Sequence, residues 1–187
     1  MRDAVPIMRP MVYDFPERPE AQVADLQYLL GGDLLVAPFY RPGGCRLVWF
    51  PPGEWLHYLN GPTVNGPGFQ EVTLPLEQAP LWVRAGSTIL LAGPGRRIGE
   101  GRYVRLTLAL VVGRSGVVSP ARVSLPSFGD AAIVVEPVTR GAASISAPAG
   151  LPPLEVVMVG TSADVPAVYL NGSPVVVTRR AGLVTET

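Results

Sequence analysis

Short apolar runs separated by turn residues are the feature that most constrains how this chain can fold. Gly and Pro together make up 42 of its 187 residues. The runs between them are rich in Val, Ile, Thr and aromatic residues, which favour pleated strands, whereas Gly and Pro interrupt helices and strands alike. The pattern therefore predicts an all-β protein built from many short strands and tight turns.

The expected strands follow one another at short intervals, which is typical of β-sandwiches. They are residues 46–50, 70–74, 81–84, 88–91, 103–112, 122–125, 132–135, 154–159, 167–170 and 174–178. Only residues 19–30 predict a helix, because apolar residues there follow a Pro-rich entry at helical spacing.

Turns and one Gly-rich stretch divide these strands. Asn60-Gly61, Asn65-Gly66 and Asn171-Gly172 are the residue pairs that two-residue hairpin turns favour, since both central positions take positive φ. Residues 92–101 (AGPGRRIGEG) hold too few apolar side chains for a core. This stretch predicts a linker between two sandwich units, with the boundary after residue 92.

Composition and charge exclude several functional classes. Charged residues are 16% and the formal net charge is zero, with the Arg residues dispersed along the chain. Nucleic acid binding is therefore not expected, and no apolar run is long enough to cross a membrane. A single Cys and a single His cannot form an internal disulfide or a usual zinc site, so we expect no metal and no cofactor. The N-terminus lacks the apolar stretch of a signal peptide, which predicts a cytoplasmic protein.

Three features could carry chemistry, and each has a plainer structural explanation. The Gly-rich stretch could hold a phosphate beside Arg96 and Arg97, but it lacks the order of a phosphate-binding loop and is better explained as a linker. His57 could contact a sugar or act as a base, although a surface or interface role explains it without a catalytic partner. Cys45, beside Arg46, could have an acidic thiol, but no nucleophilic unit surrounds it in the sequence.

Carboxylates and tryptophans provide two further candidates. Paired carboxylates are the groups that glycoside hydrolysis requires, and an acidic group lies near the N-terminus, although caps and turns explain its members as well. Its members are Asp14, Glu17, Asp25 and Asp33. Three tryptophans could form a stacking platform for a sugar, with core packing as the alternative explanation. They are Trp49, Trp55 and Trp82, of which Trp55 is expected at a turn.

Four segments of the first half are more specific than their composition. They are residues 5–11 (VPIMRPM), 25–38 (DLQYLLGGDLLVAP), 48–55 (VWFPPGEW) and 79–87 (APLWVRAGS). In order and spacing they resemble glycoside hydrolase family 31, the family of α-glucosidases and α-xylosidases. The resemblance covers about residues 2–91, and beyond it only residues 167–172 (AVYLNG) are similar to the family's closing hairpin.

The resemblance implies which part of such an enzyme this sequence represents. The family's nucleophile and acid/base aspartates lie in segments upstream of the one that residues 5–11 resemble, and neither segment occurs in this sequence. Retaining hydrolysis needs two carboxyl groups roughly 5 Å apart on a rigid frame. We therefore expect a C-terminal portion that supports the catalytic barrel and is inactive alone, with no catalytic, cofactor-binding or metal-binding residue.

The resemblance also implies three parts and a set of partners. Residues 1–33 would be a remnant of the last (β/α)8 barrel strand with a linking helix, residues 34–92 a proximal sandwich and residues 93–187 a distal sandwich. The expected partner is the catalytic barrel, in cis or as a separate chain. Without it, the apolar face from Ile7 to Phe15 favours self-association, with the segment before Leu34 disordered or packed on a neighbouring molecule. The alternative is a stand-alone β-sandwich module that binds a carbohydrate or a protein.

Overall fold

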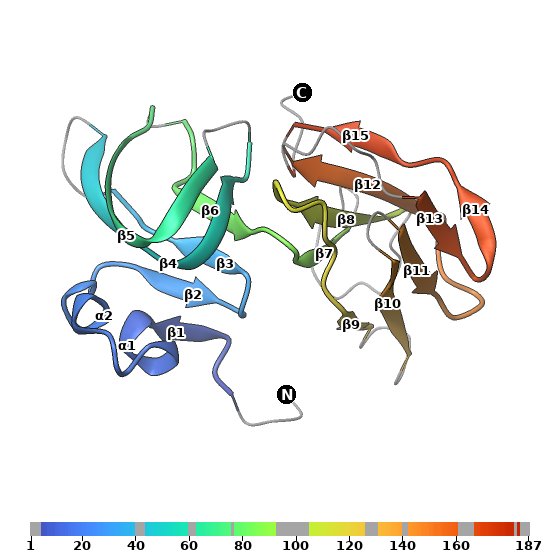
Figure 1. Ribbon diagram of the computed structural model, residues 1–187, viewed down its shortest axis with the longest axis horizontal. Helices are drawn as coiled ribbons and strands as arrows, with labels where there is room; N and C mark the ends of the chain where they lie inside the picture. The colour runs from blue at the N-terminus through green and yellow to red at the C-terminus, as the bar shows by residue number, and fades with distance from the viewer. Residues whose placement is uncertain are drawn as a thin grey trace. The chain divides into compact units, whose positions relative to one another are not determined.

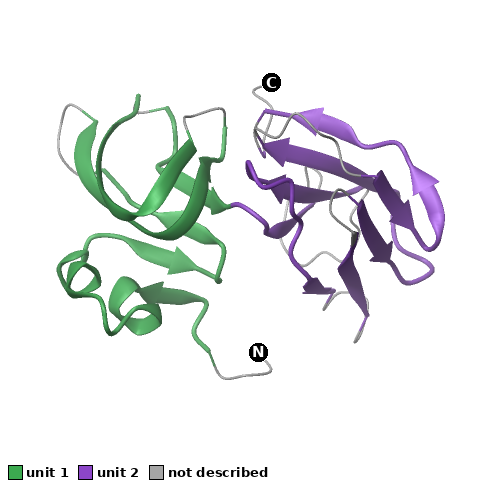
Figure 2. Ribbon diagram, viewed as in Figure 1, with its two compact units in different colours: residues 1–84, 186–187 green, residues 85–185 purple. Residues whose placement is uncertain are grey.

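The computed structural model describes residues 5–39, 44–59, 63–75, 77–92, 105–125, 131–139, 142–160, 167–181 and 183. Two compact units make up the chain: unit 1 holds residues 1–84 and 186–187, and unit 2 holds residues 85–185 (Figure 2). The described residues are mostly in strands, with two short helices, α1 (Met11–Asp14) and α2 (Pro19–Val23) (Figure 1). The expected all-β class with several sheets is confirmed.

Unit 1 contains one antiparallel sheet whose strands follow the order β1-β2-β3-β6-β4-β5. The strands are β1 (Met8–Pro10), β2 (Tyr28–Leu30), β3 (Leu34–Val36), β4 (Cys45–His57), β5 (Thr63–Thr73) and β6 (Leu81–Arg84). The two longest, β4 and β5, are strongly curved (Figure 1). The described strands of this unit therefore form a single curled sheet rather than two facing sheets.

The curl of β4 and β5 begins at a bulge between them. Their register shifts between Phe50 and Gly53, opposite Gly66. A side chain at Gly66 would collide with the carbonyl oxygen of Pro51, so the close approach of the two strands requires glycine there. The hairpin turn predicted at Asn65-Gly66 is therefore wrong, because both residues lie within β5.

The first segment of the chain packs on the sheet of unit 1. Met11 and Leu29 are completely or almost completely buried in its core. For residues 5–33 the expectation of disorder is therefore wrong, while contact of this segment with a neighbouring molecule stays a prediction. No boundary between compact units falls at residues 33 and 34, because β2 pairs with β3. β1 pairs antiparallel with β2, whereas strands of a (β/α)8 barrel are parallel, so the barrel remnant stays a prediction.

The helix predicted over residues 19–30 is shorter than expected. α2 ends at Val23, and Tyr28–Leu30 is strand β2, which pairs with β1 on one side and β3 on the other. Pairing across the sheet thus outweighs the local helical spacing. The sequence pattern also missed α1.

Unit 2 consists of a four-stranded sheet, in the order β15-β12-β8-β7, and a five-stranded sheet, in the order β14-β13-β11-β10-β9. The first comprises β7 (Thr88–Ala92), β8 (Leu106–Val112), β12 (Leu154–Gly160) and β15 (Thr178–Arg180). The second comprises β9 (Ala121–Ser124), β10 (Ala132–Thr139), β11 (Ala142–Ser146), β13 (Ala167–Leu170) and β14 (Ser173–Val175). Within the first sheet, β12 runs parallel to both β8 and β15.

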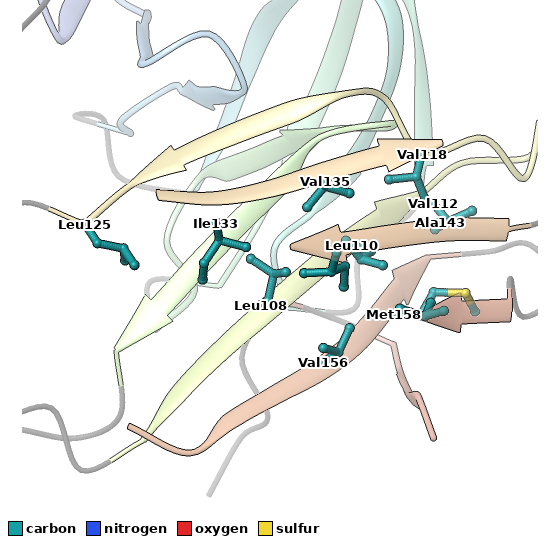
Figure 3. Packing of buried hydrophobic residues seen from close by; sticks show 12 residues of the cluster. Leu108, Leu110, Val112, Val118, Leu125, Ile133, Val135, Ala143, Val156 and Met158 are labelled. Atoms are coloured by element: carbon teal, nitrogen blue, oxygen red, sulfur yellow. The ribbon is translucent and has the colours of Figure 1, made fainter. Parts of the chain in front are cut away.

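One apolar core joins the two sheets of unit 2. Leu110 of β8 and Met158 of β12 lie in the same buried cluster as Ile133 of β10 and Ile145 of β11. Figure 3 shows most members of this cluster converging from strands of both sheets. This arrangement is a β-sandwich, as expected for the second half of the chain.

The boundary between the units differs from the expected position. The division falls between Arg84 and Ala85, because β7 pairs with β8 and so belongs to unit 2. The predicted linker at residues 92–101 lies mostly outside the described residues, as does the predicted turn at Asn60-Gly61. The turn at Asn171-Gly172 is confirmed, with φ of 49° and 83° between β13 and β14.

Candidate functional site

The three tryptophans lie inside the core of unit 1. Trp49, Trp55 and Trp82 are at most 2% exposed. The indole Nε1 of Trp55 donates to the carbonyl oxygen of Pro51 at 2.9 Å, and the Arg84 guanidinium lies 4.8 Å from the Trp55 ring centroid. A sugar-stacking platform needs exposed rings, so this candidate is excluded. The prediction of Trp55 at a turn is also wrong, because it lies within β4.

His57 is buried at the end of β4 rather than exposed on the surface. Its side chain is 2% exposed, and its Nε2 lies 3.2 Å from the carbonyl oxygen of Ala79. Because a carbonyl oxygen only accepts, Nε2 carries the proton in this contact and Nδ1 is the unprotonated nitrogen. Burial lowers the pKa of His57 and outweighs the opposing effect of the Ala79 carbonyl. The imidazole is therefore neutral near pH 7, and its hydrogen bond connects the end of β4 to Ala79.

Cys45 is exposed at the start of β4. Its Sγ donates to Oε1 of Glu71 at 3.4 Å. The neighbouring Arg46 directs Nη1 to the carbonyl oxygens of Leu26 and Pro38, at 3.0 and 2.7 Å. The guanidinium group therefore ties three segments of unit 1 together, and the contact of the Cys45 thiol is with the Glu71 carboxylate rather than with a cationic group that would stabilise a thiolate.

The acidic group near the N-terminus has separate structural roles. Asp14 forms an ion pair with Arg9, with 2.7 Å between Oδ2 and Nε. Burial raises the pKa of Asp33, an effect that the nearby Arg84 and Arg9 oppose. Glu17 and Asp25 are exposed. Asp14 therefore has a structural ion pair, and neither α1 nor α2 has a side-chain cap, so the expected capping role is not seen in these helices.

The remaining candidates concern a phosphate site and a metal site. Arg96 and Arg97 lie outside the described residues. Within the described ranges, no cluster of three or more His, Cys, Asp or Glu side chains could hold a metal ion. The part of the chain that the structure describes also contains no helix long and apolar enough to cross a membrane.

Five exposed apolar side chains lie within nine residues of one another on the first segment of unit 1. We call this group the N-terminal patch; its members are Val5, Ile7, Met8, Val12 and Tyr13. Ile7 is 61% exposed and Met8 59%, although both lie next to a well-packed core. β1 is also an edge strand of its sheet. Apolar patches beside an unpaired strand edge are typical of surfaces that another protein segment covers.

Two clefts of similar size lie within unit 1. The apolar cleft, of about 450 Å³, lies between the α2–β2 connection and the ribbon of β4 and β5, and exposes Val23, Leu26, Leu47 and Phe69. The other, which we call the β5 cleft, has a volume of about 460 Å³. Its lining residues are His57, Thr63, Val64, Asn65, Gln70, Glu71, Val72, Thr73, Leu74 and Trp82.

The first half of the chain matches a known domain family. Residues 4–89 match the model of the glycosyl hydrolase family 31 C-terminal domain. This segment belongs to that domain family. The match includes nearly all of unit 1 and ends within β7, and it confirms the resemblance of the four sequence segments.

Curated relatives match about half of the chain. An α-glucosidase of Saccharolobus solfataricus is 34% identical over 88 residues, which are 47% of this chain and 12% of that protein. An α-xylosidase of the same organism is 30% identical over 112 residues, which are 59% of this chain and 15% of that protein. The chain thus spans a small fraction of the length of these family 31 relatives.

Solved structures extend the likeness into unit 2. The family 31 α-xylosidase of Xanthomonas citri is 29% identical, with a TM-score of 0.66 over 84% of this chain and 19% of that chain. A family 31 dextranase of Flavobacterium johnsoniae, complexed with glucose, is 26% identical, with a TM-score of 0.60 over 70% of this chain and 17% of its own. The main segment of unit 1 ends at Arg84, which is less than half of the chain. A match that covers 84% of the chain must therefore include part of unit 2. Both units are therefore similar to parts of larger family 31 enzymes.

The sequence interpretation missed the polar side chains of the β5 cleft. A signal for them existed, because residues 70–74 (QEVTL) place Gln70, Val72 and Leu74 on one face of a strand. Residues from the two ends of β5 line one cleft, and the bulge between β4 and β5 lies between these ends, at Gly66. The sequence pattern suggested a turn at this glycine instead.

Proposed function

We propose that this chain is the C-terminal β-rich portion of a family 31 glycosidase of the α-glucosidase or α-xylosidase type, and that it supports the catalytic barrel without hydrolysing glycosides itself. The family match of residues 4–89 supports the first part. The relatives, in which the matching segment is a small fraction of a longer enzyme, support the existence of a covalently linked or separately encoded barrel.

The N-terminal patch is the observation that carries the supporting role. Ile7, Met8 and Tyr13 are each more than half exposed, while Met11 beside them is fully buried. Burying one large apolar side chain is worth roughly 1.5–3 kcal/mol, so a partner that covers several of them binds with substantial free energy. An apolar face of the barrel is the partner that this patch fits best.

The chemistry of the described acidic residues supports inactivity of the chain alone. Retaining glycosidases need two carboxyl groups about 5 Å apart, one as nucleophile and one as acid/base. Asp14 is engaged by Arg9, and Asp33 lies half-buried near Arg84. A carboxylate in an ion pair at 2.7 Å is poorly available as a nucleophile.

The test compares the isolated chain with the assembly recovered from its source cells. We expect no release of p-nitrophenol from p-nitrophenyl α-glucoside or α-xyloside by the purified 187-residue chain. Immunoprecipitation from the source cells with an antibody to unit 1 should recover hydrolysis of one of these substrates. Hydrolysis by the purified chain, or an immunoprecipitate without activity on either substrate, would overturn the proposal.

A further inference from the structure

The β5 cleft combines a curved strand with side chains from both of its ends. Thr63 and Asn65 come from the beginning of β5, and Gln70 and Thr73 come from its end. The register of β4 and β5 shifts at the residues that separate these two halves of β5, and residues of both halves line one cavity of about 460 Å³. That volume lies within the roughly 300–1,000 Å³ of sites that hold small molecules.

The lining of the cleft has an apolar floor and a polar rim. Val64, Val72 and Leu74 are half-buried and pack against the core of unit 1, beside the buried Trp82. Around them lie two amides and two hydroxyls, which both donate and accept hydrogen bonds, and the carboxylate of Glu71. A ligand that fits must present C–H surface to the floor and hydroxyl groups to the rim.

The charge of the lining excludes an anionic ligand. Among the lining residues that the structure describes, Glu71 is the one charged side chain and no Arg is present. His57 is neutral near pH 7, because its Nε2–H is committed to Ala79 and burial lowers its pKa. Phosphate and carboxylate ligands require cationic or charge-assisted donors, which this cleft does not offer.

The apolar cleft shows that this composition is not general to unit 1. Its volume is nearly the same, about 450 Å³, but exposed Val23, Leu26, Leu47 and Phe69 dominate its surface. Its polar lining differs from that of the β5 cleft, because Asp25 and Arg46 are charged and the amide of Gln27 is bonded to the backbone of Trp49. The polar rim is therefore a specific property of the β5 cleft.

We propose that the β5 cleft binds one or two units of a neutral saccharide. The amides of Asn65 and Gln70 form hydrogen bonds with ring hydroxyls, and the C–H face of the sugar lies on Val64, Val72 and Leu74. Glu71 is the one carboxylate among the described lining residues, and retaining hydrolysis needs two, so the cleft binds without hydrolysis. This inference does not rest on the proposed function, because binding is measured on the chain itself.

The test is a titration of the ¹⁵N-labelled 187-residue chain with maltotriose, isomaltotriose and xylotriose, followed by amide chemical shifts. We expect at least one trisaccharide to shift β5 amides and the Trp82 indole, with a dissociation constant on the order of 1 mM. Shifts confined to other residues, or none at about 50 mM of every probe, would overturn the proposal.

Variants separate the polar rim from general surface effects. Loss of one neutral hydrogen bond is worth about 0.5–1.5 kcal/mol, so Asn65→Ala and Gln70→Ala should each weaken binding by roughly two- to twelvefold. Gln22→Ala removes the same kind of exposed amide from α2 and should leave the affinity unchanged. Glu71→Gln keeps an acceptor and should change the affinity less than twofold if the ligand is neutral, by the same hydrogen-bond scale. An equal loss in Gln22→Ala, or a collapse of binding in Glu71→Gln, would contradict the assignment.

Discussion

The two units bury their apolar residues to different extents. Most of the large apolar side chains that are exposed in the described residues belong to unit 1, where they gather in the N-terminal patch and the apolar cleft. Those of unit 2 come one each from separate segments: Val117, Val138, Tyr169 and Val176. Isolated exposed residues of this kind are normal on a folded surface, whereas gathered ones indicate contact with a partner. Unit 2 is thus closed around its own core, and unit 1 has surface left to cover.

The largest effects should come from the separate cores of the two units. Trp49 belongs to the buried cluster of unit 1 and Leu110 to that of unit 2, and the clusters share no residue. Trp49→Ala should lower the free energy of unfolding of unit 1 by about 3–5 kcal/mol, and Leu110→Ala that of unit 2 by about 2–5 kcal/mol. Hydrogen exchange, read unit by unit, should show loss of amide protection in the mutated unit. Equal loss in both units from either variant would contradict the separation.

The N-terminal patch should control association of the isolated chain. We expect the purified chain to self-associate through this patch. Ile7→Asp should raise the dissociation constant of the dimer by roughly tenfold or more, because it places a charge on a side chain that the dimer interface would bury. Val176→Asp is the matched control, since Val176 is 95% exposed and lies in unit 2. Sedimentation equilibrium measures both. A monodisperse wild-type monomer, or the same shift in the control, would refute the role of the patch.

The smallest effect should be a pH dependence that belongs to unit 1. His57 is the single histidine of the chain, and burial lowers its pKa from the ordinary 6.5. The unfolded chain therefore binds the proton more readily, so the stability is full above pH 6.5, falls as the pH drops from 6.5 to the lowered pKa of the folded chain, and changes no further below it. His57→Gln removes the group that titrates. The urea midpoint of unit 1 should therefore change less between pH 7 and pH 5 in this variant than in the wild type. An unchanged slope in this variant would show that other groups govern the dependence.

Strand positions were predictable from sequence where local pattern and pairing agree. Leu81–Arg84 and Ala167–Leu170 were predicted with their observed bounds, because a short apolar run ends at clear turn residues in both cases. The run predicted at residues 174–178 instead divides between β14 and β15, which pair with different sheets. The list of expected strands lacked β1, β2, β3 and β11. Each of them is defined by the strand with which it pairs, and the local sequence does not reveal that partner.

The candidate sites were less predictable, because burial and curvature are properties of the fold. Core packing explained the tryptophans in sequence and is confirmed, whereas His57 was expected at a surface or interface and lies inside unit 1. Asn65-Gly66 lines up with the register shift between β4 and β5, so these residues have the composition of a turn but lie within a strand. The absence of a catalytic carboxylate pair stays a prediction, supported by the ion pair of Asp14.

The size of the native polypeptide tests the central claim most directly. A denaturing gel of the source cells, developed with an antibody to unit 1, reports the length of the chain that carries this domain. The account predicts a band several times larger than 19.8 kDa, or a 19.8 kDa band that co-purifies with a barrel-bearing chain. A band at 19.8 kDa with no such partner would contradict the assignment of unit 1 as a support for a catalytic barrel.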